Sequence, residues 1–244
     1  MMVLQYSVVI LVCFFGAALQ ATIGFGFPIV AMIFFSYVFP LPAATTICQS
    51  AGIVGVGYIF FKYIKQVQWR TLTPFLITAL ITGVIFTWAT GYLPVAGMKV
   101  YMGAVLCIIA MFMLFAASKV KLRPTMLSGC SMGLLSGAMN GLFAIGGPPV
   151  ALYLLPAIND KIAYLASANA YFFLFKIFNL PIRFMNGSVG KEHVGFILTA
   201  IIFMTLGTVV GERIMLRVNR KLFQKLVYTF VLLSGTIIVI QEVL

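Results

Sequence analysis

Charged residues are scarce in this sequence, and acidic residues are the scarcest. Of 244 residues, 63% are hydrophobic and only 8% are charged, with 4 Asp and Glu against 16 Lys and Arg. A soluble domain carries about 25% charged residues, so the composition predicts a polytopic membrane protein instead. The acidic residues fall in expected loops or at the ends of apolar runs: Asp160, Glu192, Glu212 and Glu242. We therefore expect no sodium cage and no carboxylate proton relay inside the membrane.

Residues for metal and cofactor chemistry are also lacking. The sole histidine, His193, lies beside Lys191 and Glu192 in an expected loop, and the four cysteines show no C-x-x-C spacing. Cysteines within apolar runs are typical of small buried hydrophobes. Gly24-x-Gly26 is too short for a dinucleotide fingerprint, and no Walker motif is present. We expect no metal, no cofactor and no enzymatic activity.

The net charge of +12 does not indicate a nucleic-acid partner, because the basic residues stand in short clusters between apolar runs. The clusters lie at 62–70, 119–123 and 213–225. Positive clusters at the ends of membrane spans are typical of cytoplasmic loops. The charge pattern therefore indicates a lipid bilayer as the partner, with these three clusters on the cytoplasmic side.

Two apolar segments are broken in the same way. Residues 140–156 read NGLFAIGGPPVALYLLP, where two glycines precede two prolines, and residues 18–31 read ALQATIGFGFPIVA. Glycine loosens a helix and proline removes an amide donor. At an offset of 120 residues, residues 18–31 share five identities with residues 138–151, and Gln20 aligns with Asn140. Paired broken hydrophobic segments are the best sequence indication of a transporter's binding site.

The rest of the chain repeats this plan, which predicts an all-α fold of two inverted repeats. Each repeat has a broken or re-entrant helical hairpin followed by three transmembrane helices, with repeats at 1–123 and 124–244. The hairpins are expected at 3–39 and 125–156. The expected spans lie at 43–61, 72–91, 99–117, 162–181, 195–212 and 226–241, and residues 183–194 are expected to form a loop.

The basic clusters fall on one side of the membrane only if each hairpin returns to the side from which it enters. The first hairpin then enters from outside and the second from inside, so an odd number of crossings inverts one repeat relative to the other. We expect a multi-pass protein of the cell inner membrane with both termini outside.

The two broken hairpins and the two-repeat layout resemble the TauE/SafE family of sulfite and organosulfonate exporters. The resemblance rests on FGAALQATIGFGFPIVAMIFF and SGAMNGLFAIGGPPVALYLL and covers nearly the whole chain. The first break departs from the family's glycine-rich pattern, because Phe25 and Phe27 flank Gly26. The resemblance implies a transporter of small sulfur-containing anions.

The residues themselves also favour an anionic ligand. Broken helices offer free amide groups and positive dipole ends, so the tips 22–28 and 144–149 should approach each other and hold an anion. Glycine and proline that serve only packing are the alternative. The predicted substrate-binding residues are Gln20, Thr22, Gly24, Gly26, Pro28, Gln49, Asn140, Gly146, Gly147, Pro148, Asn169 and Lys176.

Two features of this set stay open at the sequence level. Gln20 with Asn140 and Gln49 with Asn169 form two pairs at the 120-residue offset. These amides either contact the ligand or hold the hairpins open. Lys176 is the one basic residue placed well inside a span; it either attracts the anion or extends its stem toward the outer surface. Arg213 is expected to pair locally with Glu212.

The sequence therefore predicts a secondary transporter that exports sulfite or an organosulfonate such as sulfoacetate by alternating access. An importer that relays a sulfur compound through Cys48 or Cys130 thiols, and an anion channel, are alternatives. A homo-oligomer stays open.

Overall fold

The computed structural model describes residues 2–93, 125–219 and 222. Within these residues the chain is all-helical and contains no strand. The α-helices are α1 (Met2–Ile23), α2 (Phe27–Val38), α3 (Leu41–Lys62), α4 (Trp69–Ala89), α6 (Met126–Phe143), α7 (Gly147–Ala157), α8 (Lys161–Met185) and α9 (Val194–Arg217). Two short 3-10 helices, η1 (Ile64–Gln66) and η2 (Lys191–His193), join them.

The all-α, polytopic fold class is confirmed. Within the described residues, five helical segments are long and apolar enough to cross a membrane: Met2–Ile23, Leu41–Lys62, Trp69–Ala89, Lys161–Met185 and Lys191–Arg217. The expected spans 99–117 and 226–241 lie outside the described residues. The prediction for 183–194 is wrong in part, because α8 continues past Pro181 to Met185.

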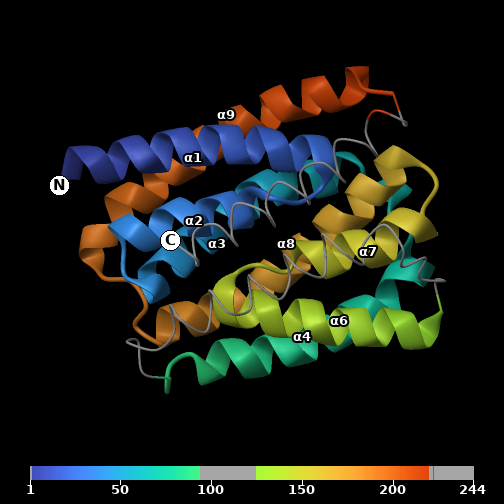
Figure 1. Cartoon of the computed structure of the whole chain (residues 1–244), viewed down its shortest axis with the longest axis horizontal. Coiled ribbons are helices and arrows are strands. Elements are labelled where there is room, and N and C mark those ends of the chain that lie inside the picture. The colour runs from blue at the N-terminus through green and yellow to red at the C-terminus, as the bar shows by residue number, and fades with distance from the viewer. Residues whose placement is uncertain (1, 94–124, 220–221, 223–244) are drawn as a thin grey trace, which may run out of the picture.

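The helices run along the long axis of the molecule, and the hairpins enter from opposite ends (Figure 1). The α1–α2 hairpin starts and finishes at the end that holds the N-terminus. The α6–α7 hairpin starts and finishes at the opposite end. The first helix of each hairpin also packs along a helix that is distant in sequence. Helix α1 packs along α9, and α6 packs along α4. These directions are those that the sequence predicts for the hairpins; the division into repeats at 123/124 stays a prediction.

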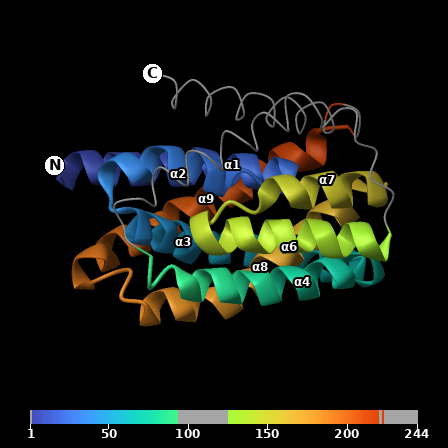
Figure 2. The ribbon, with the colours of Figure 1, turned by 60° about the horizontal axis from the view of Figure 1, so that its bottom comes forward.

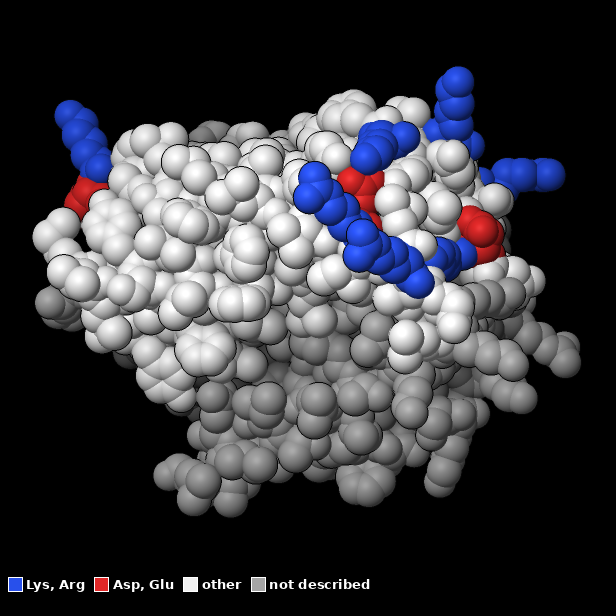
Figure 3. Space-filling view, turned by 90° about the horizontal axis from the view of Figure 1, so that it is seen from above, with Lys and Arg blue, Asp and Glu red and all other residues white. Residues whose placement is uncertain are grey.

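On the face of the molecule seen in Figure 3, the exposed charged side chains of the described residues lie at the two ends of the bundle. Basic side chains gather where α3 and α9 end and where α4 and α8 begin, with a few charged groups at the opposite end and an uncharged belt between. The residues at the basic end include Lys62, Lys65, Arg70, Lys161, Arg213 and Arg217. Such a belt is suited to the apolar core of a bilayer.

Helices α3 and α8 form the centre of the described bundle (Figure 2). Their most apolar windows are 78% and 61% buried, whereas those of α1, α4 and α9 are 28–33% buried. The outer helices expose large apolar side chains such as Leu11, Ile81 and Ile202. Polar side chains on α3 or α8 are therefore held away from lipid and must find partners inside the protein.

Each break is made possible by unusual backbone conformations. Gly24 and Gly26 adopt φ angles of 91° and 118°, and Ala144 has a φ of 63°. A positive φ is readily adopted by glycine but seldom by other residues. Proline then occupies the first turn of both α2 and α7, where its missing N–H costs nothing.

Helix α9 approaches α1 so closely that two glycines are required. A Cβ atom on Gly207 would lie 2.1 Å from the Phe14 carbonyl oxygen, and one on Gly211 would lie 2.2 Å from the Ala18 carbonyl oxygen. The two glycines are four residues apart, as in the small-residue interfaces of membrane helices. Gly133 and Gly137 bring α6 equally close to α4.

Gly211→Val should therefore separate α9 from α1 and destabilise the protein by about 2 kcal/mol or more. The neighbouring Val210, which is partly exposed, provides the control, and Val210→Ala should change stability by less than about 0.5 kcal/mol. Thermal unfolding in detergent measures both. Equal melting temperatures for the two variants would contradict this packing.

Candidate functional site

The tips of the two hairpins meet inside the protein. A Cβ atom on Gly147 would lie 2.7 Å from Cδ2 of Phe25, which is fully buried. Pro28, Gly146, Gly147 and Pro148 are likewise buried. The approach of the tips expected from the sequence is confirmed. The positive amino-terminal ends of α2 and α7 thus both lie in the protein interior.

A chain of hydrogen bonds links Lys176 on α8 to the second break. The Lys176 ammonium donates to Gln49 Oε1, and Gln49 Nε2 donates to Asn140 Oδ1 at 2.9 Å. Asn140 Nδ2 then donates to the Tyr171 hydroxyl oxygen at 3.3 Å.

The last acceptor in this chain of hydrogen bonds is a backbone carbonyl at the second break. The Ser136 hydroxyl lies 2.9 Å from that of Tyr171 and donates to the Gly146 carbonyl oxygen at 2.7 Å. Because the Ser136 proton is used in this bond, Tyr171 must be the donor to Ser136. Every link therefore runs in one direction, from the ammonium to the Gly146 carbonyl.

Lys176 does not extend to the surface. It is 2% exposed, and its ammonium approaches α3, where a Cβ atom on Gly52 would lie 2.8 Å from Nζ. Among the described residues, its hydrogen-bond partner is the neutral Gln49 amide. Of the two interpretations left open by the sequence, the structure favours a cation directed into the protein.

Gly52→Ala should displace this ammonium, since the new methyl group occupies its position, and should weaken the anion binding predicted from the sequence about 3- to 10-fold. The fold should persist because the atom displaced is the far end of a flexible side chain. Gly57→Ala on the same helix is the matched control, because its Cβ would meet the Phe173 ring at 3.0 Å rather than a polar group. Unchanged affinity in Gly52→Ala, measured by calorimetry, would show that the ammonium position does not matter.

Arg183 is the main correction to the sequence interpretation. It was expected in an outer loop, but it lies on α8 and is 1% exposed. Its guanidinium donates to Thr45 Oγ1 at 2.9 Å and to the carbonyl oxygens of Asn140 and Gly141 at 3.2 and 2.6 Å. These two carbonyls belong to the last turn of α6, just before the break, where the Asn140 carbonyl also accepts from the Ala144 N–H at 3.0 Å and the Gly141 carbonyl from the Thr87 hydroxyl at 3.4 Å. Arg183 thus binds the negative end of the α6 dipole.

Three other predicted residues lie apart from this network. Thr22 donates to the carbonyl oxygens of Ala18 and Gly211, and so joins α1 to α9. Asn169 donates to the Leu165 carbonyl of its own helix at 2.8 Å. Gln20 is buried, and its Oε1 has no hydrogen-bond partner within the described ranges. The structure joins one member of each expected amide pair, Gln49 to Asn140, and the equivalent Gln20–Asn169 bond is not among those it shows.

Glu212 does not form the local pair with Arg213 that the sequence suggested. Its carboxylate accepts from Lys62 Nζ at 2.8 Å, from the Tyr58 hydroxyl at 3.0 Å and from the Tyr63 hydroxyl at 2.6 Å. Burial, and then the hydrogen bond to Glu212, raise the pKa of Tyr63 to about 12, so Tyr63 keeps its proton at neutral pH. The cluster joins α3 to α9 at the basic end.

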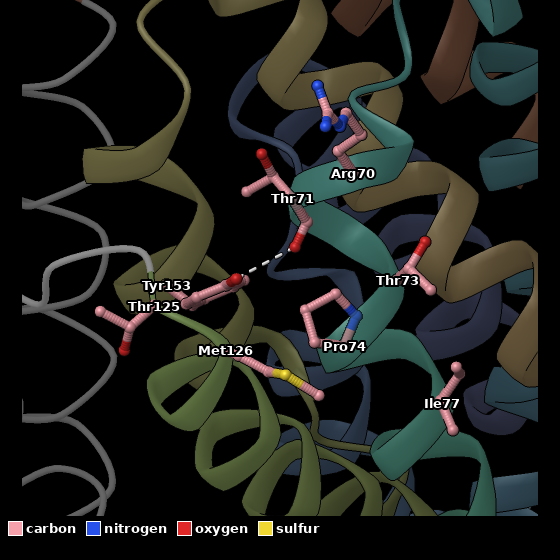
Figure 4. Close-up of a pocket in the computed structure, with 8 residues that line it drawn as sticks. All are labelled: Arg70, Thr71, Thr73, Pro74, Ile77, Thr125, Met126 and Tyr153. Atoms are coloured by element: carbon pink, nitrogen blue, oxygen red, sulfur yellow. Dashed lines mark hydrogen bonds between the residues drawn. The ribbon is translucent and has the colours of Figure 1, made fainter.

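A surface hollow of about 510 Å³ lies elsewhere, beside the start of α4 and α6 (Figure 4). The Tyr153 hydroxyl donates to the Thr71 carbonyl at 3.0 Å there. The other lining residues are Arg70, Thr73, Pro74, Ile77, Thr125 and Met126. None of the predicted binding residues lines this hollow.

The described cysteines are free thiols. Cys13 and Cys48 are fully buried, and Cys130 is partly exposed near the Pro74 carbonyl. Cys48 follows Ile47 and precedes Gln49 on α3, close enough to Lys176 and Arg183 to interact with both charges. Within the described ranges no three His, Cys, Asp or Glu residues cluster as a metal site would require.

Comparison with known proteins now adds to this geometry. The family model described as "Sulfite exporter TauE/SafE" matches residues 9–238. The chain belongs to the TauE/SafE family. No curated protein and no solved structure matches it. As a member of this family it is a multi-pass membrane transporter of the sulfite and sulfur-anion class.

Proposed function

We propose that this TauE/SafE protein exports a small sulfur-containing anion, sulfite or an organosulfonate such as sulfoacetate, across the inner membrane. The anion binds between the two hairpin tips, beside Lys176 and the Gln49–Asn140 pair. The observation that carries the proposal is the buried Lys176 ammonium, whose one hydrogen-bond partner within residues 2–93 and 125–219 is a neutral amide.

A buried cation without a counterion is costly in a membrane protein and marks a functional site. The two helix amino termini that meet at Phe25 and Gly147 add positive potential to the same region. Neutral amide and hydroxyl groups supply further donors that fix the orientation of an oxyanion. All three features suit a small anion and none suits a cation.

Alternating access follows from the hairpins in this proposal. Each hairpin packs mainly along one helix, α1 on α9 and α6 on α4. One hairpin that shifts relative to the other, together with the helix of the opposite repeat along which it packs, would expose the tips first to one side and then to the other. With the basic end in the cytoplasm and both termini outside, the negative-inside potential drives anions outward without a coupling ion.

The thiol-relay importer is the second candidate, because the buried Cys48 is next in sequence to Gln49, the hydrogen-bond partner of Lys176, on α3. Cys48→Ser separates the two. In the proposed anion site the thiol takes no part, so the serine variant should keep its sulfite affinity within about 3-fold. A thiol relay requires the sulfur and would lose all uptake of a thiosulfate-type compound in proteoliposomes. Cys13→Ser, at another buried thiol, controls for the loss of packing.

Binding to the purified protein tests the proposal. Calorimetry with sulfite, sulfoacetate, taurine and thiosulfate should show saturable binding of at least one anion, weakened in Asn140→Ala. Binding of carboxylates or cations without any sulfur anion would overturn the substrate class. A large conductance that does not saturate with concentration would indicate a channel.

A further inference from the structure

Lys176 is not the only buried cation, and this bears on the charge of the substrate. Arg183 lies seven residues further along α8, which is two turns on the same face and about 10.5 Å along the axis. Asn169 lies seven residues before Lys176 in the same row. The row faces α3 and α6, from which every hydrogen-bond partner of the two cations comes.

The two charged heads converge. Lys176 contacts Gln49 and Arg183 contacts Thr45, and these partners are only four residues apart on α3, about 6 Å along its axis. Both cations are also linked to Asn140. Arg183 donates to its carbonyl oxygen, and Gln49 bridges its side chain to Lys176. A single small ligand near Asn140 would lie within the field of both.

No carboxylate of the described ranges balances these charges. Asp160 caps the far end of α8 through the Ala163 amide, Glu192 lies in an exposed loop beside His193, and Glu212 is bound by Lys62. The partners of both cations are neutral amide, hydroxyl and carbonyl groups. The α6 carboxyl terminus supplies only about half a negative charge. Lys176 and Arg183 together therefore retain more than one positive charge that no group of the described residues neutralises.

Arg183 also retains an unused donor. Its Nε–H is buried and has no hydrogen-bond partner in the part of the chain that the structure describes, although both terminal nitrogens are engaged. A buried donor without a partner is unusual and calls for a ligand or solvent. The guanidinium is suited to oxyanions because its donors match their geometry.

We propose that Arg183 is the second cation of the anion site and that, together with Lys176, it selects a doubly charged anion over a singly charged one of similar size. The inference rests on the proposed function, whose site it shares. Two fixed charges stabilise a dianion more than a monoanion, whereas the desolvation of the site is the same for both.

Two organosulfonates with the same two-carbon chain provide the test. Sulfoacetate carries a carboxylate and two charges, and isethionate carries a hydroxyl in its place and one charge. Calorimetry on the full-length protein should show sulfoacetate binding at least about 10-fold more tightly. The preference should fall below about 3-fold in Lys176→Gln and Arg183→Gln, and it should persist in Arg183→Lys, which keeps the charge.

The outcomes separate this inference from the proposed function. Equal affinities of the wild-type protein for the two sulfonates would overturn dianion selection and leave the anion transporter standing. A full preference in a folded Arg183→Gln protein would reduce Arg183 to a residue that only holds α6. If Arg183→Gln does not fold, the wild-type ratio and Lys176→Gln decide. Binding of neither sulfonate, nor of sulfite, would overturn both proposals.

Discussion

Lys176→Met is expected to weaken binding of the sulfur anion by about 100-fold or more. A charge pair at 4 Å is worth about 4 kcal/mol at the effective dielectric of partly buried sites, and each 1.4 kcal/mol is a factor of ten in affinity. The fold should not suffer. Methionine has a similar length, and it removes a buried charge whose hydrogen-bond partner within the described part of the chain is the neutral Gln49 amide. Calorimetry and thermal unfolding on the same preparation measure the two effects.

Lys161→Met is the matched control for this experiment. Lys161 begins the same helix, and its ammonium donates to the carbonyl oxygens of Met215 and Val218 at the basic end. It lies fifteen residues, or about 22 Å, from Lys176 along α8. The control should bind the anion normally. Equal affinity losses in both variants, or none in Lys176→Met, would contradict a site at Lys176.

Asn140→Asp is expected to have the second large effect, a loss of anion affinity of about 100-fold without loss of stability. The new carboxylate can accept from Gln49 Nε2, which lies 2.9 Å from Asn140 Oδ1, and its other oxygen faces the Tyr171 hydroxyl, whose proton then turns to it from Ser136. It also places a fixed negative charge between Lys176 and Arg183, which competes with the anion. Thermal unfolding should show an unchanged or higher melting temperature.

Asn140→Leu distinguishes charge from structure at this position. Leucine leaves the Gln49 and Tyr171 groups without their partner, and each unsatisfied buried group costs about 1–3 kcal/mol. This variant should therefore lose both stability and binding, whereas Asn140→Asp should lose binding alone. An aspartate variant that binds the anion as tightly as the wild type would show that the substrate does not sense the field at Asn140.

Much of the fold could be predicted because it follows from backbone chemistry. Gly-rich breaks followed by proline fix where α1 and α6 end and where α2 and α7 begin, and the described helices match these expectations within a few residues. The clustering of basic residues at one end follows from the same sequence pattern. Lipid imposes both features, since unpaired amides and charges are costly in hydrocarbon.

Arg183 shows where sequence reasoning failed. Pro181, two residues earlier, suggested the end of the helix, but α8 continues through it to Met185. Proline can be accommodated in a membrane helix when neighbouring helices satisfy the freed groups. The signal that was missed is the seven-residue spacing of Asn169, Lys176 and Arg183, which places all three on one face. Ser136, one turn before Asn140, was missed in the same way.

Glu212 and the amide pairs required tertiary information. The repeat relates Gln20 to Asn140 and Gln49 to Asn169, but it does not say which amides touch, and the structure joins Gln49 to Asn140. Similarly, the neighbour of Glu212 in sequence is Arg213, whereas its partner in space is Lys62, 150 residues away. Spacing along the sequence predicts where the helices lie, but the packing of one helix on another decides which side chains form hydrogen bonds.

Counterflow in proteoliposomes tests the central claim most directly. Vesicles loaded with unlabelled sulfite or sulfoacetate are diluted into a trace of the labelled anion, and its entry is followed for the wild-type protein, Lys176→Met and Lys161→Met. The account predicts saturable uptake accelerated by the internal anion, present in the wild type and Lys161→Met and absent in Lys176→Met. Uptake that is not accelerated by internal anion, or that persists in Lys176→Met, would contradict a carrier whose site is formed at Lys176 between the two hairpins.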